Sequence, residues 1–495
     1  MSSLIIPFPA ELRPRLPTIV GNVDYLTLRQ RLEQIDSLLH ASGLERQFVE
    51  RALHGWLAPA NPAPSTRQQQ KFQARCRRAL RCNLLRTLLQ EDYRGLSCQL
   101  AGNPLYQWFC LIDALDQVRV PSKSELQRFA HWLPAGQMRE LSNSLLRSAL
   151  DQHQKLRLRE PLDLAAYFLD TTALKANIHF PVDWVLLRDG VRTLMKATTL
   201  IRAQGLKGRM PPPQEFLRRI NRLSIEMTHQ RRTADCRRGR KRVLRQMKKL
   251  VKVVRAHARR HRHRLDAQWQ QTELTRPQAE QILRRLDRVL ELLPRAQQQA
   301  HDRIIGGRLV ENREKILSLY EPDVHVIVRG KAGAEVEFGN TALLGENRQG
   351  LIVDFQVYQE AAPADAHLLV ESLERMQAGL GRTVGTVAAD RGFANAINHE
   401  GLAEAGIFNG ICPRQPQQLK ERMKDKKFVN LQRRRSQTEA RIGILKNGFF
   451  GRPMRAKGFA HRELAVAWGV LTHNLWMLAR LRKAKTKPQP LLQAA

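Results

Sequence analysis

The stretch that decides the fold is residues 383–393, Thr-Val-Gly-Thr-Val-Ala-Ala-Asp-Arg-Gly-Phe. Its apolar part, residues 384–389, predicts a short buried strand. This strand should end at the carboxylate of Asp390, because a glycine turn follows two residues later. We therefore take Asp390 as the first candidate site residue.

A second stretch, residues 432–446, predicts a helix that carries another acid between cations. Arg435, Glu439 and Lys446 stand four and seven residues apart, so they share one face of this helix. One acid at a strand end and one on a helix face, bracketed by cations, make half of a metal-dependent phosphoryl-transfer site. The missing half should be a further aspartate at a strand end.

Asp170 is the candidate for that further aspartate. Residues 162–169, Leu-Asp-Leu-Ala-Ala-Tyr-Phe-Leu, predict a strand that ends at Asp170, with two threonines behind it. From this local sequence alone, a carboxylate that only caps a turn is the favoured interpretation. The repetition of the pattern, with Asp390 ending a second apolar run, favours the functional interpretation instead.

The composition limits the partners of the chain. Its 495 residues suffice for two to four domains, and 83 lysines and arginines against 46 acids leave a net charge of +37. Such a field predicts a polyanion partner, most often nucleic acid. An anionic membrane surface is the competing interpretation, but there is no lipidation signal and no long uninterrupted apolar run. We expect a cytoplasmic protein, because the first 20 residues contain four prolines and no continuous apolar stretch.

Other classes of site are disfavoured by the sequence. The six cysteines form no Cys-x-x-Cys pair and no spacing typical of zinc, so we expect reduced thiols. His257, His261 and His263 lie among arginines that oppose a bound cation, which favours a phosphate-facing basic helix. The chain has no Gly-x4-Gly-Lys-Ser/Thr loop, which argues against ATP as a driver.

Changes in composition divide the chain into five predicted parts. Residues 1–155 predict a helical domain that binds DNA or mediates dimerisation, with an ordinary helical packing domain as the alternative. Residues 156–204 contain the first aspartate, and residues 205–320 predict a basic helical insertion that could fold as a hairpin. Residues 321–481 contain the second aspartate and the glutamate. The basic tail, residues 482–495, is expected to be disordered.

Two basic segments are candidates for contact with a polyanion. A predicted helix over residues 72–89 carries arginines that suit a DNA-facing surface, namely Arg75, Arg77, Arg78, Arg81 and Arg86. Residues 231–264 of the insertion contain sixteen cations and one acid, and they also keep a helical apolar stripe. These cations repel one another without a counter-charge, which favours contact with a phosphate backbone over a solvated face. The candidate contacts here are Lys248, Lys249, Arg259, Arg260, Arg262 and Arg264.

After residue 320 the hydrophobic pattern takes the period of strands. The predicted strands and helices, in order, are strands 324–329, 335–344 and 351–358, helix 366–376 capped by Asp365, strand 384–389, helix 393–405, strand 406–412, a polar loop 414–427, and helix 464–481. This order, with an acid after one strand and another on a later helix, resembles that of a ribonuclease-H-like domain. In that fold the first and fourth strands are neighbours, so their acids meet. The resemblance implies an α/β core with a mixed sheet, to which the helical N-terminal domain and the basic insertion are added.

The motifs resemble more closely those of bacterial insertion-sequence transposases of the DDE superfamily. The helix over 432–446 looks like the Tyr-x2-Arg-x3-Glu-x6-Lys signature of that superfamily, with Gln432 in place of the tyrosine. Asp170-Thr-Thr resembles its first aspartate motif, and Asp390-Arg-Gly-Phe its second. The resemblance covers about residues 90–480, and the insertion falls between the two aspartates.

This resemblance implies a metal-dependent reaction on DNA. Asp170, Asp390 and Glu439 would hold two Mg²⁺ ions, with Mn²⁺ as a substitute. One ion would activate a water or a 3′-hydroxyl, and the other would stabilise the leaving oxygen. The enzyme would first hydrolyse the phosphodiester at the ends of its mobile element and then join the freed 3′-hydroxyl to target DNA. The implied phosphate contacts near the site are Arg391, Arg435, Arg441 and Lys446.

The implied partners are double-stranded DNA of the terminal inverted repeats and of the target, without ATP and without a membrane. A homodimer or larger synaptic oligomer is expected because two DNA ends must be joined, and the expected location is the bacterial nucleoid. Two rivals stay open at this point, namely an inactive transposase-derived DNA-binding protein and a nuclease of the same fold that does not transfer strands. A membrane-associated basic protein would need an amphipathic helix with exposed aromatic residues, which residues 231–264 lack.

Overall fold

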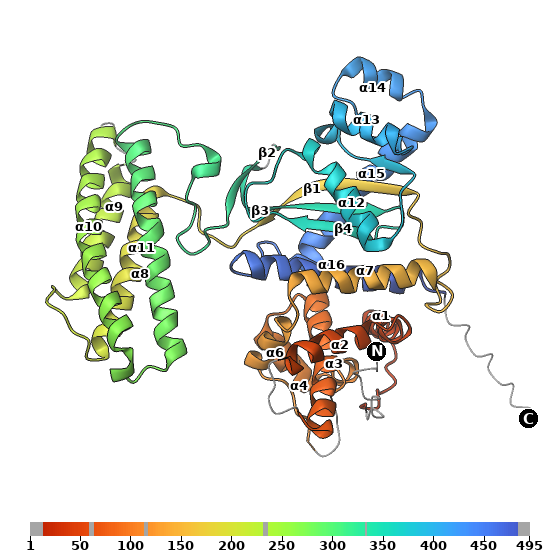
Figure 1. Ribbon diagram of the computed structural model, residues 1–495, viewed down its shortest axis with the longest axis horizontal. Coiled ribbons are helices and arrows are strands. Elements are labelled where there is room, and N and C mark those ends of the chain that lie inside the picture. Colours follow the sequence, from red (N-terminus) through yellow and green to blue (C-terminus); the bar gives the residue numbers. More distant parts are fainter. Residues whose placement is uncertain (1–12, 59–63, 113–116, 231–235, 332–333, 484–495) are drawn as a thin grey trace, which may run out of the picture.

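The computed structural model describes residues 13–58, 64–112, 117–230, 236–331 and 334–483. Nearly all of the expected basic tail lies outside the described residues, so this expectation is not tested. Figure 1 shows a central sheet, a group of N-terminal helices on one side of it, and a separate bundle of long helices. Over the described ranges, no helix has the length and apolar character needed to cross a membrane.

The sheet contains six strands, and their arrangement confirms the prediction of a mixed α/β core. The strands are β1 (Ala166–Lys175), β2 (His325–Lys331), β3 (Ala334–Asn347), β4 (Ile352–Val357), β5 (Thr386–Ala388) and β6 (Phe408–Asn409). Their order is β2-β3-β1-β5-β6, and β4 also pairs with β3. β3 runs antiparallel to β1, β2 and β4, whereas β5 runs parallel to both β1 and β6.

Strand β1 is longer at its C-terminal end than its sequence predicts. We expected it to end at Asp170, but the ladder with β3 continues through Asp170↔Leu344 to Lys175↔Gly339. The expectation failed because the two threonines and the second apolar run, Ala173 and Leu174, are also compatible with a strand, and the apolar pair is buried in it. Asp170 therefore lies within the ladder with β3, whereas the ladder with β5 ends two residues before it.

The helices after the sheet strands follow the predicted order with one addition. They are α12 (Leu369–Leu380), α13 (Ala396–Glu404), α14 (Pro416–Arg422), α15 (Lys426–Leu445) and α16 (Phe459–Leu481). The predicted polar loop over 414–427 contains the short helix α14. Helix α16 contacts β4 on one side and the N-terminal helices on the other (Figure 1).

The N-terminal helices share one hydrophobic core with the sheet. They are α1 (Val23–Ala41), α2 (Leu44–Leu57), α3 (Thr66–Leu89), α4 (Tyr93–Gly102), α5 (Pro104–Phe109), α6 (Lys123–Ala130) and α7 (Ala135–Asp151). A single cluster of buried side chains runs from Leu32 through the sheet to Ala479. Trp468 of α16 packs against Phe48 with ring centroids 6.0 Å apart and donates its indole N–H to the carbonyl of Ala130. These helices are therefore continuous with the sheet, and the expected separate domain over 1–155 has no core of its own among the described residues.

The arginines of α3 are not a DNA-facing surface, which corrects the interpretation from sequence. Arg81 is fully buried and contacts Glu45 and Asp36, each at 2.6 Å, and Arg77 bonds Glu45 at 2.9 Å. The guanidinium of Arg86 lies over the ring of Tyr93, and its burial lowers its pKa. The remaining two bond within the protein, Arg75 to Glu125 and Arg78 to the carbonyl of Leu111.

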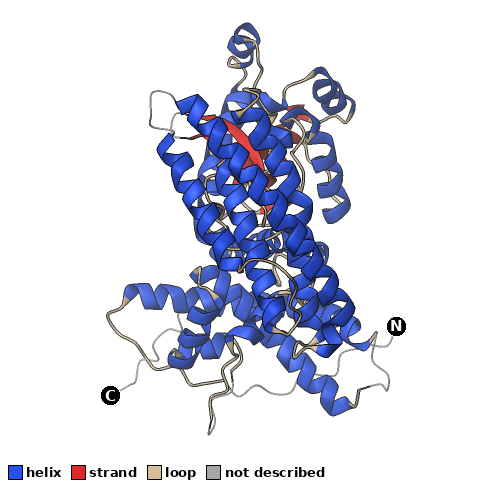
Figure 2. Cartoon of the chain, turned by 90° about the vertical axis from the view of Figure 1, so that its left-hand side faces the viewer, coloured by secondary structure: helices blue, strands red, loops and turns tan. Residues whose placement is uncertain are grey.

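The insertion folds as four long helices with a core of their own. They are α8 (Asp183–Ala203), α9 (Pro213–Gln230), α10 (Cys236–Gln268) and α11 (Arg276–Ile304). Their buried apolar side chains, from Trp184 to Leu319, form a cluster distinct from that of the sheet. The unit therefore begins near residue 183, where we expected 205, because α8 buries its apolar face against α9, α10 and α11. Figure 2 views the molecule from the side of this bundle, with the strands behind it.

Candidate active site

The register of the sheet brings Asp170 and Asp390 to the same level of neighbouring strands. Parallel strands β1 and β5 pair Phe168 with Ala388, and each aspartate follows two residues later. Neighbouring strands lie about 4.8 Å apart, so the two carboxylates leave adjacent parts of the sheet. Glu439 comes from α15, which contacts both β1 and β5. Segments separated by more than 200 residues thus place their acids in one region.

The electrostatics of Asp170 show that the three acids influence one another. Burial, followed by the negative charges of Asp390 and Glu439, raises the pKa of Asp170 to about 7. The backbone N–H of Thr171, 2.8 Å from the carboxylate, and the positive charge of Arg435 act in the opposite direction. Burial and the neighbouring acids thus disfavour the ionised form of Asp170, and a bound cation would favour that form.

Asp390 is oriented by the turn that follows it. Its carboxylate accepts a 2.8 Å hydrogen bond from the N–H of Gly392 and caps the short helix η4 (Arg391–Phe393). A Cβ at Gly392 would lie 2.9 Å from Oδ1 of Asp390 and 3.0 Å from Oδ2 of Asp365, so a larger residue there would displace these two carboxylates. Asp365, which the sequence suggested only as a helix cap, is thus a fourth carboxylate beside the site. Arg391 itself is exposed.

Glu439 extends into solvent beside a cation. Its side chain is 60% exposed, and its carboxylate lies 3.8 Å from the guanidinium of Arg435. Gln432, at the position where the family signature has a tyrosine, donates to the carbonyls of Ala389 at 3.2 Å and Gly410 at 2.6 Å. Its own amide oxygen accepts from Arg435. The amide therefore anchors α15 to the ends of β5 and β6 and holds Arg435 in place.

Lys446 lies next to the strand that carries Asp170. The side chain is buried, and its ammonium group donates to the hydroxyl of Thr172 at 3.3 Å. Thr172 and Asp170 are two residues apart on β1, so their side chains point to the same face of the sheet. The basic end of the signature helix is thus placed beside the first aspartate.

A buried acid that sequence reasoning missed fixes α15 on the sheet. Glu346 of β3 is 1% exposed and accepts from Arg434 at 2.8 Å, from Thr438 at 2.7 Å and from Arg441 at 3.3 Å. An acid at the end of the apolar run Ala-Leu-Leu-Gly was the available signal, because a buried carboxylate requires partners. Arg441, predicted to contact DNA, is committed to this internal network.

The basic residues predicted on the insertion fall into two groups. Arg262 is bonded to Asp287 and Asp266, which raise its pKa, and Arg264 donates to the carbonyl of Lys207. The other four, Lys248, Lys249, Arg259 and Arg260, carry no ion pair among the residues the structure describes, although Lys248 contacts His301 and Arg260 contacts His257. Lys249, Arg259 and Arg260 are the exposed members.

Two of the three histidines among these arginines face the interior of the bundle. His257 and His261 are buried, and burial lowers the pKa of both imidazoles. This corrects the expectation of a phosphate-facing set, since only His263 is exposed. The apolar stripe of α10 continues through these positions, so the side chains turn inward with it.

The three acids are of the type that binds a hard divalent cation, but their side chains do not surround a common position. Within the described ranges, no group of three or more His, Cys, Asp or Glu side chains is arranged to hold a metal ion. Carboxylate oxygens are nevertheless the ligands that Mg²⁺ prefers, so the acids match such an ion in chemistry although they do not form a ready-made ligand set.

Comparison with known proteins gives one match. Residues 328–475 match the family model described as the transposase DDE domain, a segment that includes Asp390 and Glu439. No curated protein and no solved structure matches the chain. Residues 328–475 are therefore similar to a transposase DDE domain, in agreement with the resemblance that the motifs of this segment indicated.

Proposed function

We propose that this protein cleaves DNA at the ends of an insertion sequence with Mg²⁺ and joins the freed ends to target DNA. The observation that carries the proposal is the parallel pairing of β1 with β5, which brings Asp170 beside Asp390, together with the packing of α15, which carries Glu439, against both strands. A ribonuclease-H-like core is part of the proposal. It is supported by the antiparallel series β1-β3-β4, followed by β5 and β6 parallel to β1.

Asp170, Asp390 and Glu439 are the proposed metal ligands. Two bound Mg²⁺ ions, or Mn²⁺ in their place, would supply an activated hydroxyl and stabilise the leaving oxygen of the phosphodiester. The role of this chain's residues is to provide oxygen donors from fixed backbone positions. Asp170 must give up its proton for this role, and its raised pKa places that step near neutral pH.

The cations beside the acids are proposed to hold the DNA backbone. Lys446 approaches from the β1 side and Arg435 from the α15 side, while exposed Arg391 follows Asp390 directly. Positive charge there would stabilise the negative charge that develops on the transferred phosphoryl group. Arg441, Arg262 and Arg264 are assigned structural roles because they are bonded within the protein.

Synapsis of two element ends requires at least a dimer, and we place the protein at the bacterial nucleoid. A DNA partner is further supported by the net charge of +37 and by the exposed Lys249, Arg259 and Arg260 of α10. Lys248, which lies on the same helix, completes this proposed contact set.

The proposal is tested by incubating the purified protein with Mg²⁺ and DNA that carries the terminal repeats of the element. Asp170→Asn, Asp390→Asn and Glu439→Gln should each lower cleavage and joining by about 100-fold or more, since each removes a metal ligand. Glu280→Gln, which changes an exposed acid of the bundle, is the matched control and should keep full activity. Activity that survives any of the three changes would remove that residue from the role. Cleavage without joining in the wild-type protein would point to a nuclease of the same fold.

A further inference from the structure

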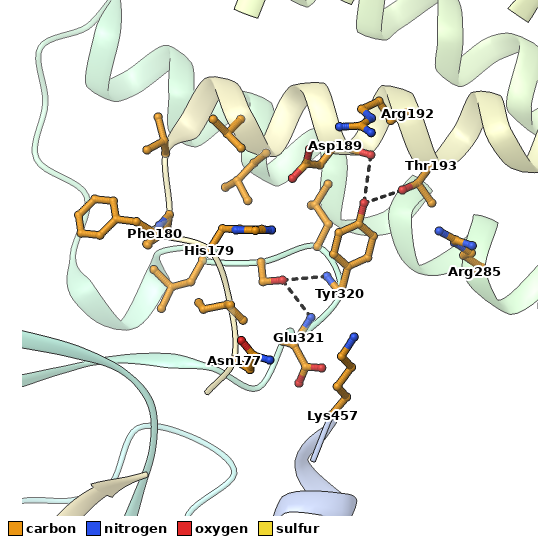
Figure 3. A pocket seen from close by; sticks show the side chains of 18 of the residues that line it. Asn177, His179, Phe180, Asp189, Arg192, Thr193, Arg285, Tyr320, Glu321 and Lys457 are labelled. Carbon is orange, nitrogen blue, oxygen red and sulfur yellow. Dashed lines mark hydrogen bonds between the residues drawn. The ribbon is translucent and has the colours of Figure 1, made fainter. Parts of the chain in front are cut away.

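A basic cleft lies where the four-helix bundle meets the sheet. Its volume is about 350 Å³, and its walls come from the segment after β1, from α8 and α11, from residues 317–321 and from the segment before α16. In Figure 3, Arg192 and Thr193 extend from α8 and Arg285 from α11, while Lys457 rises from the opposite side. The cleft is therefore shared by the bundle and by the segments that connect it to the sheet and to α16.

The positive charges of this cleft are not neutralised within the protein. Arg192, Lys196, Arg285 and Lys457 line it, are exposed, and have no ion pair with any described residue. The two acids in the lining are already occupied. The carboxylate of Asp189 accepts a 3.1 Å hydrogen bond from Arg188. The carboxylate of Glu321 accepts hydrogen bonds from Arg462 and from the N–H of Gly458. Neither Arg188 nor Arg462 lines the cleft. Four uncompensated cations thus face one cavity, whereas many other arginines of the chain are paired.

The walls of the cleft are held in position by hydrogen bonds. The hydroxyl of Tyr320 bonds Thr193 at 2.6 Å and donates to the carbonyl of Asp189 at 3.3 Å, which ties the returning linker to α8 (Figure 3). The hydroxyl of Ser318 accepts from the N–H groups of Tyr320 and Glu321. These hydrogen bonds fix the backbone segments from which the cations extend.

A continuous strand connects the carboxylates to this cleft. β1 carries Asp170, then Thr172 in contact with Lys446, and it ends at Lys175, whose carbonyl accepts from the N–H of Met454 at 2.9 Å. Residues 454–457 therefore run beside the end of β1 and deliver Lys457 to the cleft, where Asn177 also lies. Asn177 lies seven positions beyond Asp170, and a fully extended chain of that length spans roughly 23 Å. This is an upper limit, because the N–H of Ile178 bonds the carbonyl of Ala176 in a turn around Asn177.

We propose that this cleft binds the DNA backbone within about seven base pairs of the phosphate held at the carboxylates. A rise of about 3.4 Å per base pair converts the span of roughly 23 Å into that number. The inference rests on the proposed function for its substrate, but it assigns a separate contact site made by Arg192, Lys196, Arg285 and Lys457. The bundle would then bind the DNA duplex next to the cleavage site.

The salt dependence of DNA binding tests the proposal without any cleavage step. Duplex binding is measured by fluorescence anisotropy in EDTA for the full-length wild type, Arg192→Ala/Arg285→Ala and a matched control, Arg276→Ala/Arg284→Ala. The control removes the same charge from exposed positions of α11 outside the cleft. The cleft variant should reduce the slope of log K against log salt by about 1.8, because each phosphate contact contributes about 0.9. Over a tenfold range of salt concentration this difference amounts to roughly 60-fold in affinity.

Two further measurements, a charge-retaining variant and a competition with pyrophosphate, test the assignment. Arg192→Lys/Arg285→Lys keeps the charges and should restore the wild-type slope, which excludes misfolding as the cause. Pyrophosphate at matched ionic strength should not displace DNA from the wild type more readily than from the cleft variant. An equal fall in slope for the cleft and control variants, or no fall in either, would overturn the proposal. Selective displacement by pyrophosphate would replace the DNA backbone with a small phosphorylated ligand.

A footprint measures the position of the contact. Hydroxyl-radical protection on terminal-repeat DNA should be lost within about seven base pairs of the cleavage site in Arg192→Ala/Arg285→Ala and kept in the control variant. Protection that is lost elsewhere or not at all would contradict the assigned path. If the wild type binds with the expected slope but never cuts, the proposed function fails while the cleft stands. If the wild type cuts but the cleft variant keeps the full slope, the cleft assignment fails while the proposed function stands.

Discussion

The ammonium group of Lys446 donates a 3.3 Å hydrogen bond to the hydroxyl of Thr172, although 274 positions separate the two residues. This contact attaches the C-terminal end of the signature helix to the strand that carries Asp170. Gln432 attaches the other end to β5 and β6, and Glu346 holds the middle. The position of Glu439 on α15 is thus determined by three contacts with the sheet.

Lys446→Met should lower DNA cleavage by about 10- to 100-fold with little loss of stability. The ammonium group is buried, and an apolar side chain of similar length fills the same space without the cost of burying a charge. Cleavage rate and melting temperature are measured together. Thr172→Val is the companion variant, because it removes the hydroxyl contact but keeps the cation. A wild-type rate for Lys446→Met would exclude a role for this charge in the reaction.

Glu346→Gln should destabilise the protein by about 3 kcal/mol, since it leaves the cations of Arg434 and Arg441 without their buried counter-charge. Hydrogen exchange in α15 should accelerate while exchange in α16 changes less. Urea denaturation gives the free energy, and mass spectrometry locates the exchange. Glu280→Gln breaks an exposed pair with Arg276 and should cost under about 1 kcal/mol. Equal costs for the two variants would show that the buried network does not hold the helix.

Asp170→Asn should stabilise the protein more at pH 8 than at pH 5. The pKa of Asp170 is raised from 3.8 to about 7 in the folded chain, so the folded state binds more protons between these values. The wild-type protein therefore loses stability as the pH rises through this window. The Asp170→Asn variant does not, because its amide carries no charge at either pH. The advantage of the variant should grow by about 2 kcal/mol between the two pH values. Urea midpoints at both pH values measure it, and a constant difference would contradict the shifted pKa.

Mg²⁺ affinity should rise about tenfold per pH unit below pH 7 and level off above it, because the ion must displace the proton of Asp170. Isothermal titration in two buffers of different ionisation enthalpy counts the protons released. About one proton should leave at pH 6 and almost none at pH 8. Asp170→Asn should abolish this pH dependence. If Mg²⁺ affinity of the wild type does not change with pH, Asp170 is not a metal ligand.

Arg81→Met should cost about 3–5 kcal/mol, because Glu45 and Asp36 lose a buried partner. The salt slope of DNA binding should stay that of the wild type, since this arginine is inaccessible to a phosphate backbone. Denaturation and anisotropy measure the two quantities. A reduced slope would restore the DNA-facing interpretation of α3.

The sequence predicted those features that depend on local pattern. The strand before Asp390 and the helix with Arg435, Glu439 and Lys446 are visible in the apolar period and in the spacing of charges. What it could not predict was the partner of each charged residue. Arg81 looks like a surface cation until α1 and α2 bring Asp36 and Glu45 against it from 45 and 36 positions away.

The same limit explains the misplaced boundary of the insertion and the missed acid. Helix α8 is amphipathic, and its sequence does not say whether its apolar face meets the sheet or the bundle. Glu346 looks like the polar end of an apolar strand, because its three donors lie 88 to 95 residues further along the chain. Periodicity shows that a face is buried but does not identify what covers it.

The chain enters and leaves the four-helix bundle at one place, since Phe180 and Leu317 line the same cavity. The described residues between these points belong to one stretch of sequence, and their apolar side chains form a core of their own. The sheet could therefore lose or acquire such a unit by a single recombination event, with only a short connector needed to close the gap. Exchange of this unit between related chains would change the proposed DNA contact of the cleft, while Asp170, Asp390 and Glu439 would keep their positions on the sheet and on α15.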